Sequence, residues 1–177
     1  MAKIRLKMGI LNDLLARVVG LKDGMDDIVR TSIEPREADI LELQKEQLFE
    51  GKASSGEDLR PYYSEDLKPA GYFRDIEAAK RYAAWKENDI AYPYEANRNP
   101  DAPNLYINGK FHSELGVNFG PMAVGVVGTT PYAAGIMSKY GISSFGLTIS
   151  NWNVIFADRG AYDALMEQVR NKLYGSN

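Results

Sequence analysis

Residues 112–128, HSELGVNFGPMAVGVVG, decide the fold class of this chain. Two short runs rich in apolar residues, at 112–119 and 122–128, flank the dipeptide at 120–121, Gly-Pro, which is typical of a tight turn. We therefore expect two antiparallel strands joined as a hairpin. Because the sequence on both sides of the hairpin has helical patterns, the chain as a whole is predicted to be α+β with a small antiparallel sheet.

Helical spacing returns after the hairpin. The pattern of residues 131–141 predicts one helix that ends at Gly141. The pattern of residues 161–173 predicts a C-terminal amphipathic helix, with Asp158 at the N-cap position. The second helix has one apolar stripe, formed by Tyr162, Leu165, Met166, Val169 and Leu173. The segment between the two helices, residues 142–160, is ambiguous between loop and strand.

Residues 3–51 also have the apolar spacing of helices. Apolar side chains recur every three to four residues, and Gly20 and Gly24 argue against one uninterrupted helix because each glycine costs about 1 kcal/mol relative to alanine. Pro35 fits the first turn of a further helix, since its missing N–H has no partner there. That helix is expected to stop at Gly51, and its stripe comprises Ile40, Leu41, Gln44 and Leu48.

Residues 52–104 are mostly connection, rich in proline and tyrosine. They are interrupted by one expected helix at 76–87, capped by Asp75, with Ala79, Tyr82, Ala83 and Lys86 on one face. A segment of this length with so little regular structure usually has a function or a partner. We treat 1–177 as one domain in which 52–104 form a long extended arm.

The aromatic side chains of this arm are the candidate subunit contacts. Aromatic residues in proline-rich loops have little core within their own segment, so they either fold back onto the domain or anchor a neighbouring subunit. Both alternatives stay open for Tyr62, Tyr63, Tyr72, Phe73, Tyr92 and Tyr94.

The composition excludes several classes of chemistry. With no cysteine, the chain has no disulfide framework, no thiolate metal site and no cysteine nucleophile. The single histidine, His112, lies beside Phe111 at an expected strand start and is interpreted as a structural or edge residue. We therefore expect no catalytic residue, no cofactor and no metal site, and a protein that is not an enzyme.

The net charge and the hydropathy of the chain limit the classes of partner that it can bind. A net charge of −3 argues against a surface devoted to nucleic acid, and no run reaches the roughly 18 apolar residues of a membrane span. The basic start of the chain reads as a helix and not as a signal peptide. Lys3, Arg5 and Lys7 alternate there, as in an arm that touches phosphates, although an ordinary solvated helix start has the same pattern.

The order of motifs in the last third resembles the tail-completion and virion-morphogenesis proteins of tailed bacteriophages, also called minor tail or head–tail connector proteins. Residues 109–113 (GKFHS) correspond to a glycine-hydrophobic-serine element entering a hairpin, 127–129 (VGT) to a strand end, and Tyr132, Ala133 and Gly141 to the following segment. The last amphipathic helix completes the pattern. Segments from residue 40 onward, such as ILELQKEQLFEGK and GYFRDIEAAKRYAAWK, are similar to uncharacterised phage and prophage proteins of gut bacteria.

This resemblance implies a structural protein of the virion, assembled in the host bacterial cytoplasm. Such proteins form rings with copies of themselves at the neck or the top of the tail and contact portal, neck or tail proteins, with passing contact to genomic DNA, no membrane and no cofactor. Two alternatives remain at this point. One is a small nucleic-acid-binding or assembly-regulatory protein that uses the basic N-terminal arm; the other is a cell-wall hydrolase of the virion, which would have to use His112.

Overall fold

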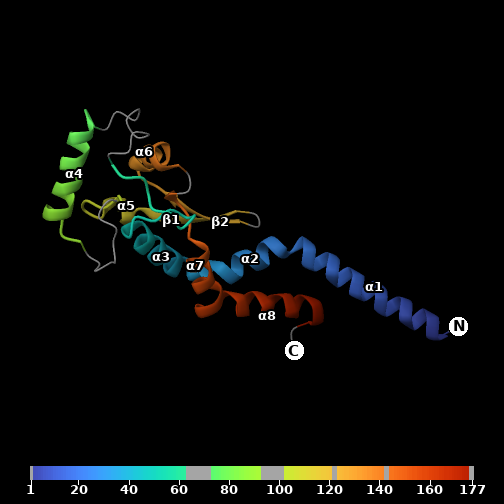
Figure 1. The fold of residues 1–177 in the computed structure, drawn as a ribbon. Coiled ribbons are helices and arrows are strands. Elements are labelled where there is room, and N and C mark those ends of the chain that lie inside the picture. The colour runs from blue at the N-terminus through green and yellow to red at the C-terminus, as the bar shows by residue number, and fades with distance from the viewer. Residues whose placement is uncertain (1, 63–72, 93–101, 121–122, 142–143, 176–177) are drawn as a thin grey trace.

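Helices at both ends of the chain enclose a two-stranded antiparallel sheet (Figure 1), so the predicted α+β class is confirmed. The structure is a computed structural model that describes residues 2–62, 73–92, 102–120, 123–141 and 144–175; for residues 2–11 it describes the backbone alone. Most described residues are helical, and the sheet consists of one hairpin.

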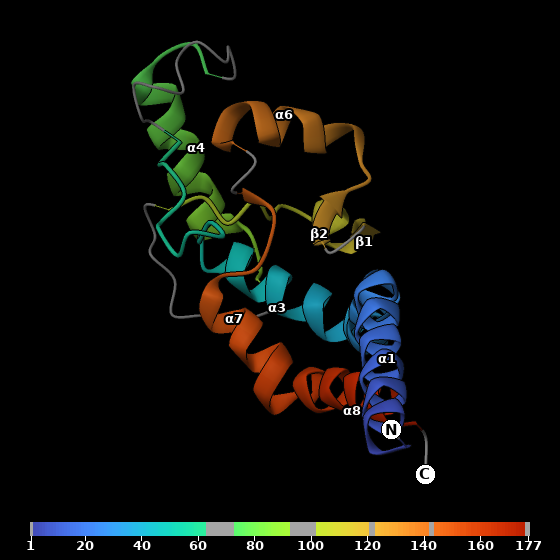
Figure 2. The same cartoon turned by 90° about the vertical axis from the view of Figure 1, so that its right-hand side faces the viewer.

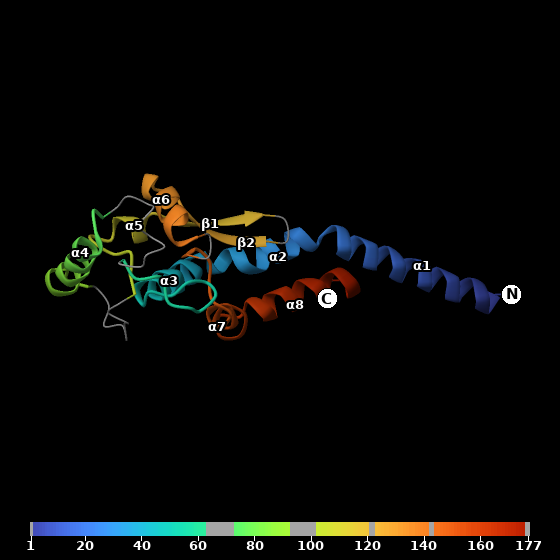
Figure 3. The ribbon, with the colours of Figure 1, turned by 45° about the horizontal axis from the view of Figure 1, so that its top comes forward.

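The N-terminal helices follow one another along an extended path (Figure 3). The chain is interrupted at Gly24, where the glycine pattern predicted a break, whereas Gly20 remains inside the first helix. Pro35 lies in the short 3-10 turn that precedes the third helix, where its lack of an N–H costs no helical hydrogen bond. The elements are α1 (Ala2–Asp23), α2 (Met25–Ile33), η1 (Glu34–Arg36) and α3 (Glu37–Phe49).

The hairpin forms where it was expected but begins later. Strand β1 (Leu115–Gly120) pairs with β2 (Ala123–Gly128), with Leu115 opposite Gly128. The expected strand start at 112 is wrong, because Lys110–Ser113 form a short helical turn, α5. Consecutive side chains of a strand point to opposite faces, whereas a helical turn allows the neighbouring Phe111 and His112 both to be buried.

Residues 105–107, just before α5, are irregular and form no strand. Leu105 has a φ of 54°, in the left-handed region, which is incompatible with extended backbone. In this irregular chain Asn104 is fully buried and Tyr106 is half-buried.

Helix α6 (Pro131–Tyr140) confirms the prediction for its segment. Thr130 caps it by accepting a hydrogen bond from the backbone N–H of Tyr132, and Gly141 ends it with a φ of 81°.

The segment that was ambiguous between loop and strand is instead helical from residue 149. Helix α7 (Ile149–Asn153) continues into a π-helical turn, η4 (Val154–Asp158), and Thr148 caps it by accepting from the N–H of Asn151. Ile155 is fully buried and the rings of Trp152 and Phe156 lie 6.1 Å apart, so apolar spacing of three to four residues drives this helix.

The C-terminal helix α8 (Ala161–Tyr174) lies beside α1 and α2 (Figure 2). Asp158 does not cap it, because the N-cap position is Gly160, with a φ of 71° and no side-chain cap. The predicted apolar stripe is only partly buried: Tyr162 is 55% exposed and Met166 is 37% exposed, while Leu165, Val169 and Leu173 are half-buried. The Nη1 of Arg17 donates to the carbonyl of Leu173 at 2.9 Å and ties α8 to α1.

The core lies around the inner side of α3. Ile40, Leu48 and Phe49 are almost completely buried there, together with Ile155 from η4. Two buried glutamines hold the chain that enters α7: the Gln44 Oε1 accepts from the N–H of Gly146 at 2.7 Å, and the Gln47 Oε1 accepts from the N–H of Thr148 at 2.8 Å. The amide oxygens of both glutamines thus give two backbone N–H groups the partners that such groups require when they are removed from water.

Helix α4 (Ile76–Asp89) is two residues longer than predicted and carries the predicted cap, since the Asp75 Oδ1 accepts from the N–H of Ala78 at 2.7 Å. The four residues expected on one face turn toward the body: Ala79 and Lys86 are each 2% exposed, and Tyr82 and Ala83 are half-buried.

We predict that Gly128→Ala destabilises the protein by about 1–3 kcal/mol, because overpacking forces neighbouring groups to move. A Cβ at Gly128 would lie 2.5 Å from the Cβ of Ala133 and 3.1 Å from the ring of Phe145. Gly125 lies in the same strand with no atom within 4 Å of a Cβ, so Gly125→Ala is the matched control and should change stability by less than about 0.5 kcal/mol. Urea unfolding of both variants measures the difference; equal stabilities would contradict the packing described.

Candidate functional site

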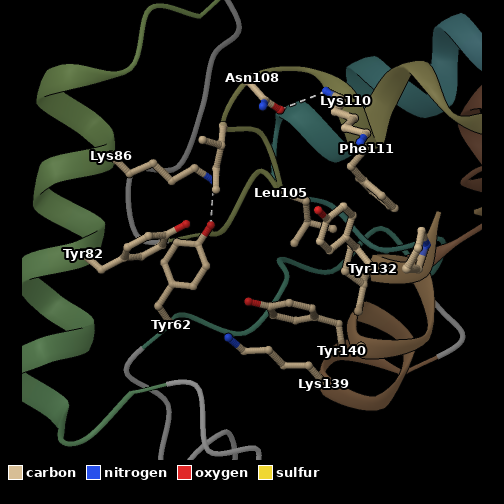
Figure 4. Close-up of a pocket in the computed structure, with 14 residues that line it drawn as sticks. Tyr62, Tyr82, Lys86, Leu105, Asn108, Lys110, Phe111, Tyr132, Lys139 and Tyr140 are labelled. Carbon is tan, nitrogen blue, oxygen red and sulfur yellow. Dashed lines mark hydrogen bonds between the residues drawn. The ribbon is translucent and has the colours of Figure 1, made fainter.

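A cavity of about 520 Å³ lies between α4, α6 and the irregular chain before α5 (Figure 4). Its size falls within the range of small-molecule sites. Aromatic rings and ammonium groups dominate its described lining, which includes Tyr62, Tyr82, Tyr132, Tyr140, Lys86, Lys110 and Lys139.

The ammonium of Lys86 is buried at one side of this cavity. Its Nζ donates to the Oη of Tyr62 at 2.7 Å and to the Oδ1 of Asn104 at 2.6 Å. Asn104 is fully buried, and its Oδ1 also accepts from the N–H of Tyr106 at 3.1 Å. A buried charge is costly without hydrogen bonds, so these oxygens are what allow Lys86 to remain inside. The three side chains come from separate parts of residues 52–104, and the network joins those parts.

Lys139 of α6 lies on the opposite side of the cavity among aromatic rings. Its Nζ is 5.1 Å from the ring centroid of Phe73, 5.4 Å from that of Tyr62 and 5.3 Å from that of Tyr140. These distances are typical of cation–π interactions. Burial lowers the pKa of Lys139 from its ordinary value.

Of the two interpretations of His112, a structural residue or an edge residue, its burial favours the structural one. Its ring is 5% exposed, lies 5.4 Å from the ring of Tyr106, and neither ring nitrogen has a hydrogen-bond partner in the described chain. Burial, followed by the charges of Lys86 and Lys45, lowers the pKa of His112 to about 4. The imidazole is therefore neutral at pH 7, and its packing among aromatic rings indicates a structural role.

Three of the six candidate contact residues have a described position, and all three pack against their own chain. The ring of Tyr62 lies 6.3 Å from that of Phe73, and the ring of Tyr92 lies 5.3 Å from that of Phe49. The Oη of Tyr92 also donates to the carbonyl of Lys86 at 2.7 Å. Their role in subunit contacts stays a prediction. Tyr63, Tyr72 and Tyr94 lie outside the described residues.

Lys3, Arg5 and Lys7 occupy the first two turns of α1. Their side chains lie outside the described part of the structure, so the predicted phosphate contact also stays a prediction.

The sequence reasoning missed a surface on α1. Four large aliphatic side chains of this helix are about half-exposed or more: Leu14 (48%), Leu15 (60%), Val18 (48%) and Val19 (49%). At 3.6 residues per turn they share about 140° of the helix circumference, and Arg17, which reaches α8, lies outside this sector. We call these four residues the α1 apolar stripe. The signal was in the repeat of Leu15 and Val18, but a repeat alone does not show whether another element covers it.

The stripe is exposed because α8 meets α1 on another side: the carbonyl of Leu173 accepts from Arg17, which lies outside the sector of the stripe. Helix α1 also projects from the rest of the molecule, with its N-terminal turns beyond the end of α8 (Figures 1 and 3). Toward the junction with α2, a shallow groove of about 400 Å³ is lined by Val18, Leu21 and Met25, with Lys22 and Asp26 at its polar side.

Comparisons of this chain with protein-family models, curated proteins and solved structures find no match. Within the described residues, no group of three or more His, Asp or Glu side chains could hold a metal ion. None of the described helices combines the length and the apolar character needed to cross a membrane.

We predict that Asn104→Ala destabilises the protein by about 2–3 kcal/mol, because it removes one of the oxygens that bind the buried ammonium of Lys86. Adding Lys86→Met should recover part of this loss, since the charge is then removed together with its acceptor. The exposed Asn108, which accepts only from the N–H of Lys110 at 3.2 Å, provides the control Asn108→Ala. Chemical denaturation of the variants tests the network; additive losses in the double variant would contradict it.

We predict that the folded protein becomes less stable as the pH decreases, because of His112. Its pKa in the folded chain, about 4, lies below the ordinary 6.5, so the unfolded chain binds the proton first as pH decreases. The stabilisation is therefore complete above about pH 7, and about 2 kcal/mol of it is lost between pH 7 and pH 5. His112→Leu, in a chain with no other histidine, should remove that part of the pH dependence in urea titrations. Identical slopes for both proteins would show that the ring is accessible to protons in the folded state.

Proposed function

We propose that this protein is a structural component of a tailed-phage virion, part of the head–tail connector or the tail-completion ring. In this role it binds copies of itself and the portal, neck or tail proteins of the same particle. It acts through these contacts and not through turnover, and it needs no cofactor. The observation that carries the proposal is the α1 apolar stripe on a helix that projects from the body.

The stripe favours a protein that works by association. Burying one large aliphatic side chain gains about 1.5–3 kcal/mol, so Leu14, Leu15, Val18 and Val19 together represent a substantial unused driving force. A contiguous apolar surface of this kind typically marks a binding interface. A ring subunit needs two different surfaces that meet across neighbours, and a projecting helix supplies one of them.

The cavity between α4 and α6 is consistent with this role. Its buried Lys86 donates to Tyr62 and Asn104, and its Lys139 is packed among rings, so these cations join segments of the chain. The neutral, buried His112 lacks the exposed, oriented position that a general base requires.

The experiment that tests the role in the virion is quantitative mass spectrometry of purified phage particles. We expect this chain in copy numbers comparable with those of the portal protein. Its absence from the particle would overturn the proposal, and salt-dependent binding to duplex DNA through Lys3, Arg5 and Lys7 would then favour the nucleic-acid alternative.

We predict that Leu15→Asp/Val18→Asp weakens self-association by about 100-fold or more, because two aliphatic side chains no longer gain burial energy. Ala16, exposed on the other side of α1, gives the matched control Ala16→Asp, which introduces the same residue into the same helix without touching the stripe. Sedimentation velocity over a concentration series measures the effect, and circular dichroism checks that each variant is folded. If the double variant associates as well as the control, the interface lies elsewhere.

A further inference from the structure

A row of acidic side chains lies along the outer face of α3 and ends at the residue that follows this helix. Glu42 and Glu46 of α3 and the C-cap residue Glu50 follow one another at four-residue spacing, and all three are exposed. Their carboxylates make no hydrogen bond or ion pair with the described residues. Like charges four residues apart destabilise a helix. A row of three carboxylates therefore lowers the stability of α3 unless a positively charged partner compensates for it. We call these three residues the α3 acidic face.

The opposite charge lies at the start of α1. Lys3, Arg5 and Lys7 occur within its first two turns, and the first acidic residue of the chain is Asp13. This N-terminal limb, residues 2–11, directly precedes the α1 apolar stripe. One helix therefore combines a basic end with an exposed aliphatic surface.

Within one chain, the backbone of the limb lies far from the α3 acidic face. Helix α1 has 22 residues and is therefore about 33 Å long. It points away from the body, and its N-terminus and α3 lie toward opposite ends of the molecule (Figures 1 and 3). A second copy can bring its limb to the face without any change in the fold.

We propose that the exposed side of α1 docks on a second copy of this chain, with its basic limb along that copy's α3 acidic face. The inference rests on the proposed function, in which copies of the chain associate. The contact joins two different surfaces, so it is head-to-tail: each subunit offers its limb to one neighbour and its face to the other. A head-to-tail contact closes into a ring when the rotation per subunit allows it.

The charges supply orientation and the stripe supplies burial. The Glu42–Glu50 row extends over about 12 Å and the Lys3–Lys7 segment over about 6 Å, so the limb fits within the length of the face. Since exposed charges are screened by salt, association through this contact weakens as ionic strength rises.

Two charge-reversed chains test the contact. The first, Lys3→Glu/Arg5→Glu/Lys7→Glu, has a reversed limb; the second, Glu42→Lys/Glu46→Lys/Glu50→Lys, has a reversed face. When either variant associates with itself, like charges face each other at every contact. We therefore expect its self-association to be at least about tenfold weaker than that of the wild type. In an equimolar mixture the reversed limb of one chain meets the reversed face of the other, while the unchanged surfaces also match. The mixture should therefore associate when neither component does.

A control separates this effect from net charge. Asp158→Lys/Asp163→Lys/Glu167→Lys changes the charge by the same amount as the reversed face, at exposed positions around α8, and should leave association unchanged. Sedimentation velocity at low and high salt gives the readout, and circular dichroism confirms folding of all three chains.

Failure of the inference differs from failure of the proposed function. If the mixture does not associate, or if the wild type is monomeric at every concentration tested, the head-to-tail contact is wrong; a chain that is nevertheless present in the virion retains its structural role. If the reversed limb abolishes binding to duplex DNA and the mixture remains dissociated, the limb is a nucleic-acid contact and the inference is overturned.

Discussion

The buried side of α3 is the constraint on which the fold depends. Ile40 and Leu48 have no exposed surface, and the hairpin, the α7 segment and the start of α8 all contribute to the same core. Gln44 and Gln47 add specificity to this packing, because their amides hydrogen-bond to backbone groups about a hundred residues later in the sequence. Apolar contacts alone would let that segment slide along the helix, whereas two directed amides fix its position.

The middle of the chain is held by polar and aromatic contacts in place of secondary structure. Lys86 joins Tyr62 to Asn104, and the ring of Tyr92 packs edge-on against Phe49 at the end of α3. A buried ammonium that loses a hydrogen-bond partner costs much free energy. Removing either of its oxygen partners therefore destabilises the protein by more than the loss of one ordinary hydrogen bond. The described residues on either side of α4, among them Tyr62, Tyr92 and Asn104, are thereby tied to the helical core.

The sequence predicts the parts of this structure that depend on local rules. The hairpin at Gly-Pro, the α6 segment, the Asp75 cap and the face that Ala79 and Lys86 share on α4 all follow from turn residues, capping residues and helical spacing. The parts that escaped prediction depend on distant contacts. Helix α7 is stabilised by a core contributed by α3, His112 is buried by rings from Tyr106 and Phe111, and the exposure of the α1 apolar stripe reflects which side of α1 packs against α8.

The central claim is that neighbouring subunits cover the α1 apolar stripe, and site-specific alkylation tests it most directly. The chain has no cysteine, so Leu15→Cys and Ala16→Cys each introduce one thiol, in the stripe and outside it. We predict that assembly slows alkylation at residue 15 by about tenfold or more relative to dilute protein, and that residue 16 changes far less. Equal reactivity of residue 15 in the assembled and the dilute protein would contradict the claim.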